Sequence, residues 1–335
     1  MSSNASHASG LQQVSKLWFE PDMVVIHAGD RIFRVLGAIL KQKSSVFADM
    51  FAFPQPSSNS DSEAENPTRP EMMDGVPVVT VYDDPTEMEV FLQAIYDSDF
   101  FMPPPKQIDI RHCLGILRLA HKYDVPYLRV RALEHLDAMF PTSLPEFISC
   151  MPQPTLGGHF GEADVDNVLR LLMATIAVAT EVGALWFIPI VYCFLLRGWD
   201  LSDIMADEAW SALTDGQRAM AINGYVALTK QWHKVFSFVS IARTANDAQC
   251  DDWADCNRKR LGASRRINNT FDQHPTSAMY CLRDSAWPKL CQHCLAEAKT
   301  IHESAKQHCW DELPTMFGFP RWGELQQMRI DALGL

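Results

Sequence analysis

Residues 22–35 read DMVVIHAGDRIFRV, and their pattern of apolar and polar side chains predicts the first elements of the fold. Its first part, Met23 to Ile26, is wholly apolar, and Arg31 to Val35 alternates polar with apolar side chains. Between them, residues 27–30 read His-Ala-Gly-Asp, a composition that favours a tight turn. Because a turn between two such runs is typical of a hairpin, the sequence predicts two strands joined over residues 27–30.

Further short elements follow this hairpin and complete a small mixed domain. Four are predicted up to residue 96: helices over 36–40 and 44–51, a valine-rich strand over 76–82, and an amphipathic helix over 86–96. Ser44 or Ser45 is placed to cap the second helix, and Asp84 or Thr86 the last one. The first domain is therefore expected to contain a small sheet packed on helices.

Two more helices are expected before the first domain ends near Pro141. Their apolar positions are Ile110, Cys113, Leu114 and Leu117, and then Leu128, Ala132, Leu133 and Leu136. The first of these helices is expected to end at Asp124-Val125-Pro126, because proline disrupts a helix. His121 lies one turn after Leu117 on the apolar face, which predicts a packed, hydrogen-bonded histidine rather than a ligand.

Composition sets the remaining boundaries. Residues 1–17 are polar and small, which predicts a flexible tail, and residues 54–75 are rich in Pro, Ser, Asn, Asp and Glu, which predicts a disordered acidic insert. We therefore place the first domain at 18–140. Residues 141–335 are predicted to form a mostly helical second domain, with an apolar stripe at Val165, Val168, Leu169, Leu172 and Ile176 and one or two helices within 213–238. The fold class is α+β.

Two groups of residues resemble the BTB/POZ domain. The first group comprises residues 22–26, 33–35, 38–40, 44–47 and 50–51, and the second comprises residues 117–125, 128–129, 132–133 and 136. Together they span about residues 18–138. The resemblance implies a BTB/POZ fold and a protein–protein interaction module, acting through self-association such as a homodimer or through recruitment of a partner protein.

The chain departs from this family at two places. Many members carry a His and then a basic residue where this chain has Leu36-Gly37, so Asp22 lacks its basic partner and the family's charged groove for corepressor peptides is not expected. The insert at 54–75 falls near the surface that cullin-binding members use. A substrate adaptor of a cullin-type ubiquitin ligase, or a BTB-type transcriptional regulator, is the alternative function, and cullin binding is expected to be weak or absent.

The second half resembles a large group of fungal BTB-containing proteins. The residues that carry this resemblance are Trp186-Phe187-Ile188-Pro189, Gly224, Leu228, Trp310-Asp311-Glu312-Leu313-Pro314 and Phe317-Gly318-Phe319-Pro320-Arg321-Trp322. The resemblance implies membership of that group and no biochemical activity.

Charge argues against nucleic acid as a partner. With 41 acidic and 29 basic residues, the formal net charge is −12, which repels a phosphate backbone. The densest basic run comprises Arg258, Lys259, Arg260, Arg265 and Arg266, and it follows Asp247, Asp251, Asp252 and Asp255. We interpret this run as a solvated, salt-bridged helix surface.

Residues 1–10 lack the charged start and apolar run of a secretory signal, so we expect an intracellular protein, either cytoplasmic or nuclear. The longest apolar stretch, Gly183 to Leu196, is about 14 residues long and contains Pro189, whereas a membrane-spanning helix needs about 20. We predict a buried helix or helix pair there, and no membrane partner.

The nine cysteines are expected to be reduced thiols or metal ligands. Cys250 and Cys256 precede Cys291-Gln292-His293-Cys294, a turn whose CxxC spacing can direct two thiolates at one ion. The four cysteines predict a structural zinc site, with ordinary buried thiols as the alternative. Further candidate ligands are His293, Cys281, His302, His308 and Cys309.

Catalytic motifs are missing from the sequence. Gly157-Gly158-His159-Phe160-Gly161 lacks the lysine of a phosphate-binding loop, and neither GxSxG nor HExxH occurs. A redox role for the CxxC turn would need a strand before it in a βαβ unit, a pattern that is absent. We therefore expect an interaction protein without an active site of its own.

Overall fold

The computed structural model describes residues 22–52, 72–150, 165–244, 249–273, 276 and 287–335. The chain divides into two compact units. Unit 1 contains the residues up to Phe101 together with Leu119–Arg129, and unit 2 contains Met102–Arg118 and Val130–Leu335. Unit 2 thus includes residues 102–118 and 130–140, which the sequence places in the first domain. The predicted tail at 1–17 lies outside the described residues.

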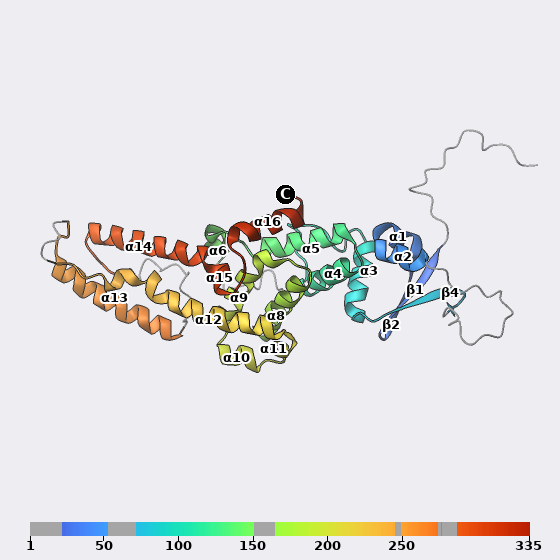
Figure 1. Cartoon of the computed structure of the whole chain (residues 1–335), viewed down its shortest axis with the longest axis horizontal. Coiled ribbons are helices and arrows are strands. Elements are labelled where there is room, and N and C mark those ends of the chain that lie inside the picture. Colours follow the sequence, from blue (N-terminus) through green and yellow to red (C-terminus); the bar gives the residue numbers. More distant parts are fainter. Residues whose placement is uncertain (1–21, 53–71, 151–164, 245–248, 274–275, 277–286) are drawn as a thin grey trace, which may run out of the picture. The chain divides into compact units, whose positions relative to one another are not determined.

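Unit 1 is built on a four-stranded sheet with the order β2-β1-β4-β3. Figure 1 labels β1, β2 and β4. The predicted hairpin is confirmed: β1 (Met23–Ala28) pairs antiparallel with β2 (Arg31–Leu36). β4 (Val76–Val81) runs parallel to β1, and the two-residue β3 (Met72–Met73) pairs antiparallel with β4. β1 therefore lies inside the sheet, which explains why its side chains are mostly buried.

The helices of unit 1 also begin near their predicted positions. They are α1 (Gly37–Lys43), α2 (Ser45–Ala52), α3 (Pro85–Tyr96), the end of α4 (Ile110–Lys122) and the start of α5 (Pro126–Met139). Ser44 caps α2, because its Oγ accepts the Phe47 N–H at 3.0 Å. The same buried hydroxyl donates to the Tyr123 carbonyl at 2.5 Å, and the Tyr123 ring stacks on Phe47 at 4.6 Å. Asp84 caps α3.

The structure corrects two predictions in this unit. His121 is exposed rather than packed, because α4 ends one residue later and the buried Tyr123 and Val125 occupy the inward positions where the chain turns. Asp22 does have a basic partner, since its carboxylate pairs with Lys41 on α1. Lys41 lies one helical turn beyond Gly37, so inspection of residues 36–37 alone missed it.

All the regular elements in the described part of unit 2 are helices. Besides the remainders of α4 and α5, it contains α6 (Leu144–Cys150), α8 (Val165–Glu181), the 3-10 helix η2 (Leu185–Phe187), α9 (Ile188–Gly198), α10 (Leu201–Ala206), α11 (Glu208–Ala212), α12 (Asp215–Val235), the 3-10 helix η3 (Ser237–Ser240), α13 (Trp253–Gln273), α14 (Gln292–Asp311), α15 (Leu313–Met316) and α16 (Trp322–Leu333). With the sheet of unit 1, the molecule is a mixed α and β protein, as predicted.

The core of unit 2 is centred on α9. Residues 188–196 are all buried, so the longest apolar stretch forms a buried helix pair, η2 and α9, as the sequence predicts. Phe187 and Phe194 pack on Phe140 at ring distances of 5.8 and 6.0 Å. No helix among the described residues is long and apolar enough to cross a membrane.

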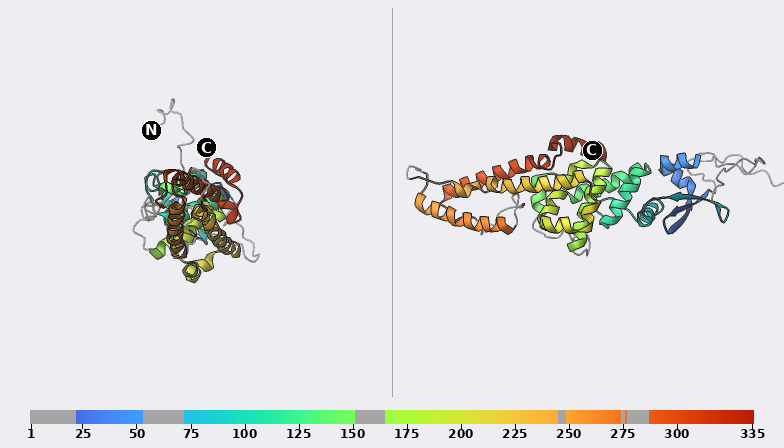
Figure 2. Two further views of the ribbon diagram at one scale, coloured as in Figure 1. Left: turned by 90° about the vertical axis from the view of Figure 1, so that its left-hand side faces the viewer. Right: turned by 60° about the horizontal axis from the view of Figure 1, so that its bottom comes forward.

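The long helices α12, α13 and α14 lie at one end of unit 2 (Figure 1). α14 packs along α12, and η3 contacts both α13 and α14. Figure 2 shows α12, α13 and α14 from a second direction, running alongside one another. The predicted cysteine ligands lie at the starts of α13 and α14.

Candidate metal centre

The four predicted cysteine ligands come from the N-terminal ends of two helices. Cys250 precedes α13 and Cys256 lies in its first turn, while Cys291 is the N-cap of α14 and Cys294 lies in its first turn. Helix N-termini carry partial positive charge and free N–H groups, which favour thiolate over thiol. Two chain segments therefore present their sulfurs at the beginnings of two helices.

The sulfur atoms form one compact cluster. The Sγ of Cys250 lies 3.5 Å from that of Cys294 and 4.0 Å from that of Cys291. All four Sγ atoms lie within 4.8 Å of one another. A tetrahedral ion with metal–sulfur bonds of about 2.3 Å requires sulfur–sulfur separations of about 3.8 Å. The cluster therefore needs only small side-chain adjustments to hold one metal ion.

Hydrogen bonds and burial fix part of the cluster. Cys256 and Cys294 are buried, and Cys250 and Cys291 are half-buried. The backbone N–H of Cys291 donates to the Sγ of Cys256 at 3.5 Å, which ties the start of α14 to α13. Such hydrogen bonds orient sulfur ligands and stabilise their negative charge.

The thiols of the cluster differ in acidity. The backbone N–H of Cys294, then that of Asp251 and the neighbouring thiols, lower the pKa of Cys291 to about 7. Desolvation, together with hydrogen bonds to the surrounding thiols, raises the pKa of Cys250 to about 12, and desolvation also raises the pKa of Cys256. Without a metal, Cys291 is therefore the first of these three to ionise. A bound cation would compensate the charge of the other thiolates.

A layer of charged residues lies one helical turn beyond the cysteines. Arg260 follows Cys256 by four residues on α13, and Glu297 follows Cys294 by three on α14. The Arg260 guanidinium donates to the Phe238 carbonyl and lies 3.4 Å from the Glu297 carboxylate, which also pairs with Arg243. These contacts join α13, α14 and η3 next to the sulfur cluster.

The position of Arg260 contradicts the prediction that the whole basic run lies on a solvated helix surface. Arg258 and Lys259 do pair with Asp255 on the exposed side of α13. Arg260 is instead 1% exposed, because it shares the inward face of α13 with Cys256. The spacing of four residues from a candidate ligand could have revealed this.

The other candidate ligands do not join the cluster. His302 is buried, and its Nδ1 lies 3.1 Å from the Val235 carbonyl. Cys309 is buried, and desolvation raises its pKa to about 12. His293 is half-buried and His308 is exposed, and neither belongs to the cluster found among the described residues. Cys281 lies outside the described residues.

Comparisons with protein-family models, curated proteins and solved structures find no match to this chain. The chemistry of the cluster and the arrangement of unit 1 are therefore what bear on function.

Proposed function

We propose that this chain is a non-catalytic interaction protein whose helical unit is held together by one structural zinc ion. The observation that carries the zinc proposal is the cluster of four cysteine sulfurs within 4.8 Å. Four thiolates complete a tetrahedral shell and leave no position for a water molecule or substrate, which is the arrangement of structural rather than catalytic zinc.

The sulfur-only shell also favours zinc over harder cations. Thiolates select zinc or iron–sulfur clusters, whereas magnesium and calcium take oxygen ligands. A single ion fits this cluster, in which the Sγ of Cys250 lies 3.5 Å from that of Cys294 and 4.0 Å from that of Cys291. Zinc has no redox chemistry of its own, which suits a role in holding α13 to α14.

Metal analysis of the purified, untagged full chain tests the zinc proposal. We expect about one equivalent of zinc per chain, and a loss of most of it in Cys294→Ser. Cys113→Ser is the matched control, because Cys113 is also buried but bonds to the Ala132 carbonyl at 3.5 Å outside the cluster. Far less than one equivalent in the wild-type chain, even after refolding with zinc, would contradict the proposal.

For unit 1, we propose a BTB/POZ-type interaction module. The order of its elements supports this: a hairpin, two short helices, a strand, and then helices. The stacked Phe47 and Tyr123 support it as well, because each belongs to one of the two stretches that resemble the family. In such a module the apolar signature residues build the core, and binding belongs to exposed surfaces.

Self-association is the simplest form that the proposed interaction role of unit 1 can take. We expect light scattering of the full chain to give about twice the mass of the 37.8 kDa monomer. A partner that copurifies from the native cell would equally support an interaction role. A strict monomer from which no partner is recovered would count against it.

A further inference from the structure

The outer edge of β2 offers hydrogen-bonding groups. β2 is the terminal strand of the sheet, and Ala28 pairs with Arg31 across a two-residue turn. In such a hairpin, the residues next to the turn exchange hydrogen bonds, and every second residue after them points its backbone away from the partner strand. The N–H and C=O groups of Ile32, Arg34 and Leu36 therefore face outward.

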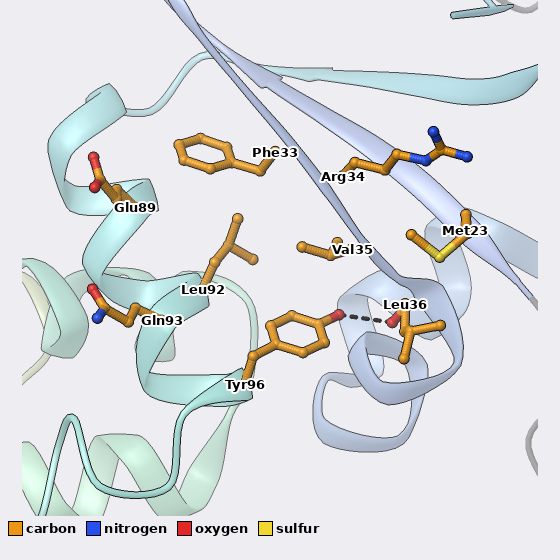
Figure 3. Close-up of a pocket in the computed structure, with 9 residues that line it drawn as sticks. All are labelled: Met23, Phe33, Arg34, Val35, Leu36, Glu89, Leu92, Gln93 and Tyr96. Carbon is orange, nitrogen blue, oxygen red and sulfur yellow. Dashed lines mark hydrogen bonds between the residues drawn. The ribbon is translucent and has the colours of Figure 1, made fainter. Parts of the chain in front are cut away.

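One contact agrees with this assignment. The Leu36 carbonyl accepts a hydrogen bond from the Tyr96 hydroxyl at 2.7 Å, so Tyr96 on α3 closes that end of the edge (Figure 3). Among the described residues, none forms a backbone hydrogen bond with the outward groups of Ile32 or Arg34. Two donors and two acceptors are thus available in a row, which is the feature that allows another strand to be added.

A groove of about 620 Å³ lies between this edge and α3. Figure 3 shows Phe33 and Val35 of β2 facing Leu92 and Tyr96 of α3 across it. These side chains form an apolar floor that matches the side-chain alternation of an added strand. An extended segment there can direct alternate residues into the groove.

The exposed side of β2 carries a positive charge, that of Arg34, between two apolar side chains. Ile32 is 54% exposed and Leu36 is 40% exposed, and Arg34 lies between them on the same side of the strand. Figure 3 shows the Arg34 guanidinium directed away from the apolar floor. Arg31 pairs with Glu89 of α3, whereas Arg34 forms no ion pair with any residue that the structure describes.

We propose that an extended segment of a partner protein docks beside β2 as a fifth strand. The segment has apolar residues at alternate positions, which enter the groove, and a carboxylate that lies across from Arg34. This inference rests on the proposed interaction role of unit 1 and assigns that role a surface. A second copy is disfavoured, because two β2 strands paired about Arg34 would place like charges opposite each other.

Peptide selection on the full chain tests the inference. The probe is a displayed library of random peptides of about 12 residues, long enough to cover a strand of usual length. We expect enrichment of sequences that alternate apolar residues, carry an Asp or Glu, and lack a central proline. Failure to enrich any peptide above a protein-free control overturns the inference.

Variants then locate the binding of the enriched synthetic peptide. Arg34→Glu should weaken it by about tenfold or more, because attraction becomes repulsion, and a peptide with Lys in place of its acidic residue should recover binding. Ile32→Pro should weaken it by removing an outward N–H that β1 does not use. Arg321→Glu is the charge-matched control, since Arg321 is exposed and lies in unit 2, and it should bind like wild type.

The outcomes separate this inference from the proposed function. Thermal melting of each variant is compared with wild type, and Arg34→Glu, on the surface, keeps the test valid if Ile32→Pro fails to fold. Equal binding of the peptide to wild type and Arg34→Glu overturns the β2 assignment. If partners from the native cell still copurify with that variant, the interaction role stands while this surface is excluded.

Discussion

Gly224 gives α12 a notch that receives the ring of Phe317. A Cβ atom at position 224 would lie 1.9 Å from Cε1 of Phe317, and that ring stacks on Tyr192 at 5.0 Å, so it has little freedom to move. Gly224→Ala should lower the free energy of unfolding by about 1–3 kcal/mol, the usual cost of overpacking. Urea denaturation of wild type and variant measures the difference.

Gly262 supplies the control for that prediction. It also lies inside a helix, α13, but the nearest side-chain atom to its Cβ position is Arg266 Nη1 at 3.9 Å. Gly262→Ala should therefore raise the free energy of unfolding by about 0.5–1 kcal/mol, since alanine is the better helix former. If both substitutions change the free energy of unfolding in the same direction, the fit of Phe317 against α12 does not decide the effect at position 224.

His302 should make stability sensitive to acid. Burial lowers its pKa below the ordinary 6.5, with a further contribution from Lys306, while the Val235 carbonyl and Glu303 oppose the shift. The folded state therefore binds fewer protons than the unfolded state, so stability is full above 6.5 and falls as the pH drops towards the folded pKa. The free energy of unfolding should fall less in His302→Asn than in wild type between about pH 7 and pH 5.

The comparison isolates His302 because other acid-sensitive groups are common to both proteins. His135 is also buried with a lowered pKa, and protonation of the cysteine thiolates would release a bound metal in either chain. Both contributions cancel in the difference. Parallel pH profiles for wild type and His302→Asn would show that His302 titrates alike in the folded and unfolded states.

Residue roles were only partly predictable from the sequence. Cys291 and Cys294 could be predicted from their CxxC spacing and Cys250 and Cys256 as a more widely spaced pair upstream, and the structure places all four sulfurs together. The spacing of four residues from Cys256 could have placed Arg260 on the inward face of α13, but it could not have identified the partners of Arg260. Its role depends on Phe238, 22 residues earlier, and Glu297, 37 residues later, and no local pattern reports contacts at that range.

Among the elements, α16 is linked to α5 by an ion pair between Arg329 and Asp137. Arg329 donates two hydrogen bonds to Asp137 of α5, at 2.7 and 2.8 Å, and the Trp186 indole donates to the same carboxylate at 2.9 Å. Arg329→Met should cost about 1–3 kcal/mol, because it leaves the partly buried Asp137 without its cation. Hydrogen exchange of residues 322–333 should accelerate.

Gln327→Ala is the matched control for the ion pair between Arg329 and Asp137. Gln327 lies on the same helix, but its amide donates to Asp331 of α16 itself, on the exposed side. Exchange of α16 should stay close to wild type in this variant. Accelerated exchange in both variants to the same extent would indicate that α16 frays for reasons unrelated to Asp137.

Local signals predicted most elements of unit 1, and one missed strand shows where they fail. The hairpin, the Ser44 cap and the Asp84 cap follow from residues close in sequence. The predicted insert at 54–75 includes β3, because a strand of only two residues, Met72 and Met73, gives no recognisable alternation of side chains. The signal that could have found it is Asp74-Gly75, where both residues have positive φ, 50° and 78°, as a two-residue hairpin turn requires.

Whole-molecule properties depend on contacts that the sequence does not encode locally. The net charge of −12 is a sequence property, but it does not reveal that Arg243 and Arg260 converge on Glu297 inside unit 2. The division of the chain into two units places one candidate function in each. A perturbation of the metal centre should therefore act on unit 2 and leave the sheet of unit 1 intact.

Metal removal tests that independence across the whole chain. Within residues 253–269 of α13, the part whose burial is described, the buried side chains besides Cys256 are Arg260, Ala263 and Ile267. Loss of a zinc ion would leave close thiols without the charge that holds them, so chelation should increase hydrogen exchange over α13 and the first turns of α14. Strands β1, β2 and β4 should keep their protection from hydrogen exchange.

The variant Cys294→Ser is the control for chelation. In this variant, hydrogen exchange of α13 should already be fast, and the chelator should not change it. A uniform loss of protection over both units would instead mean that the metal supports the entire fold.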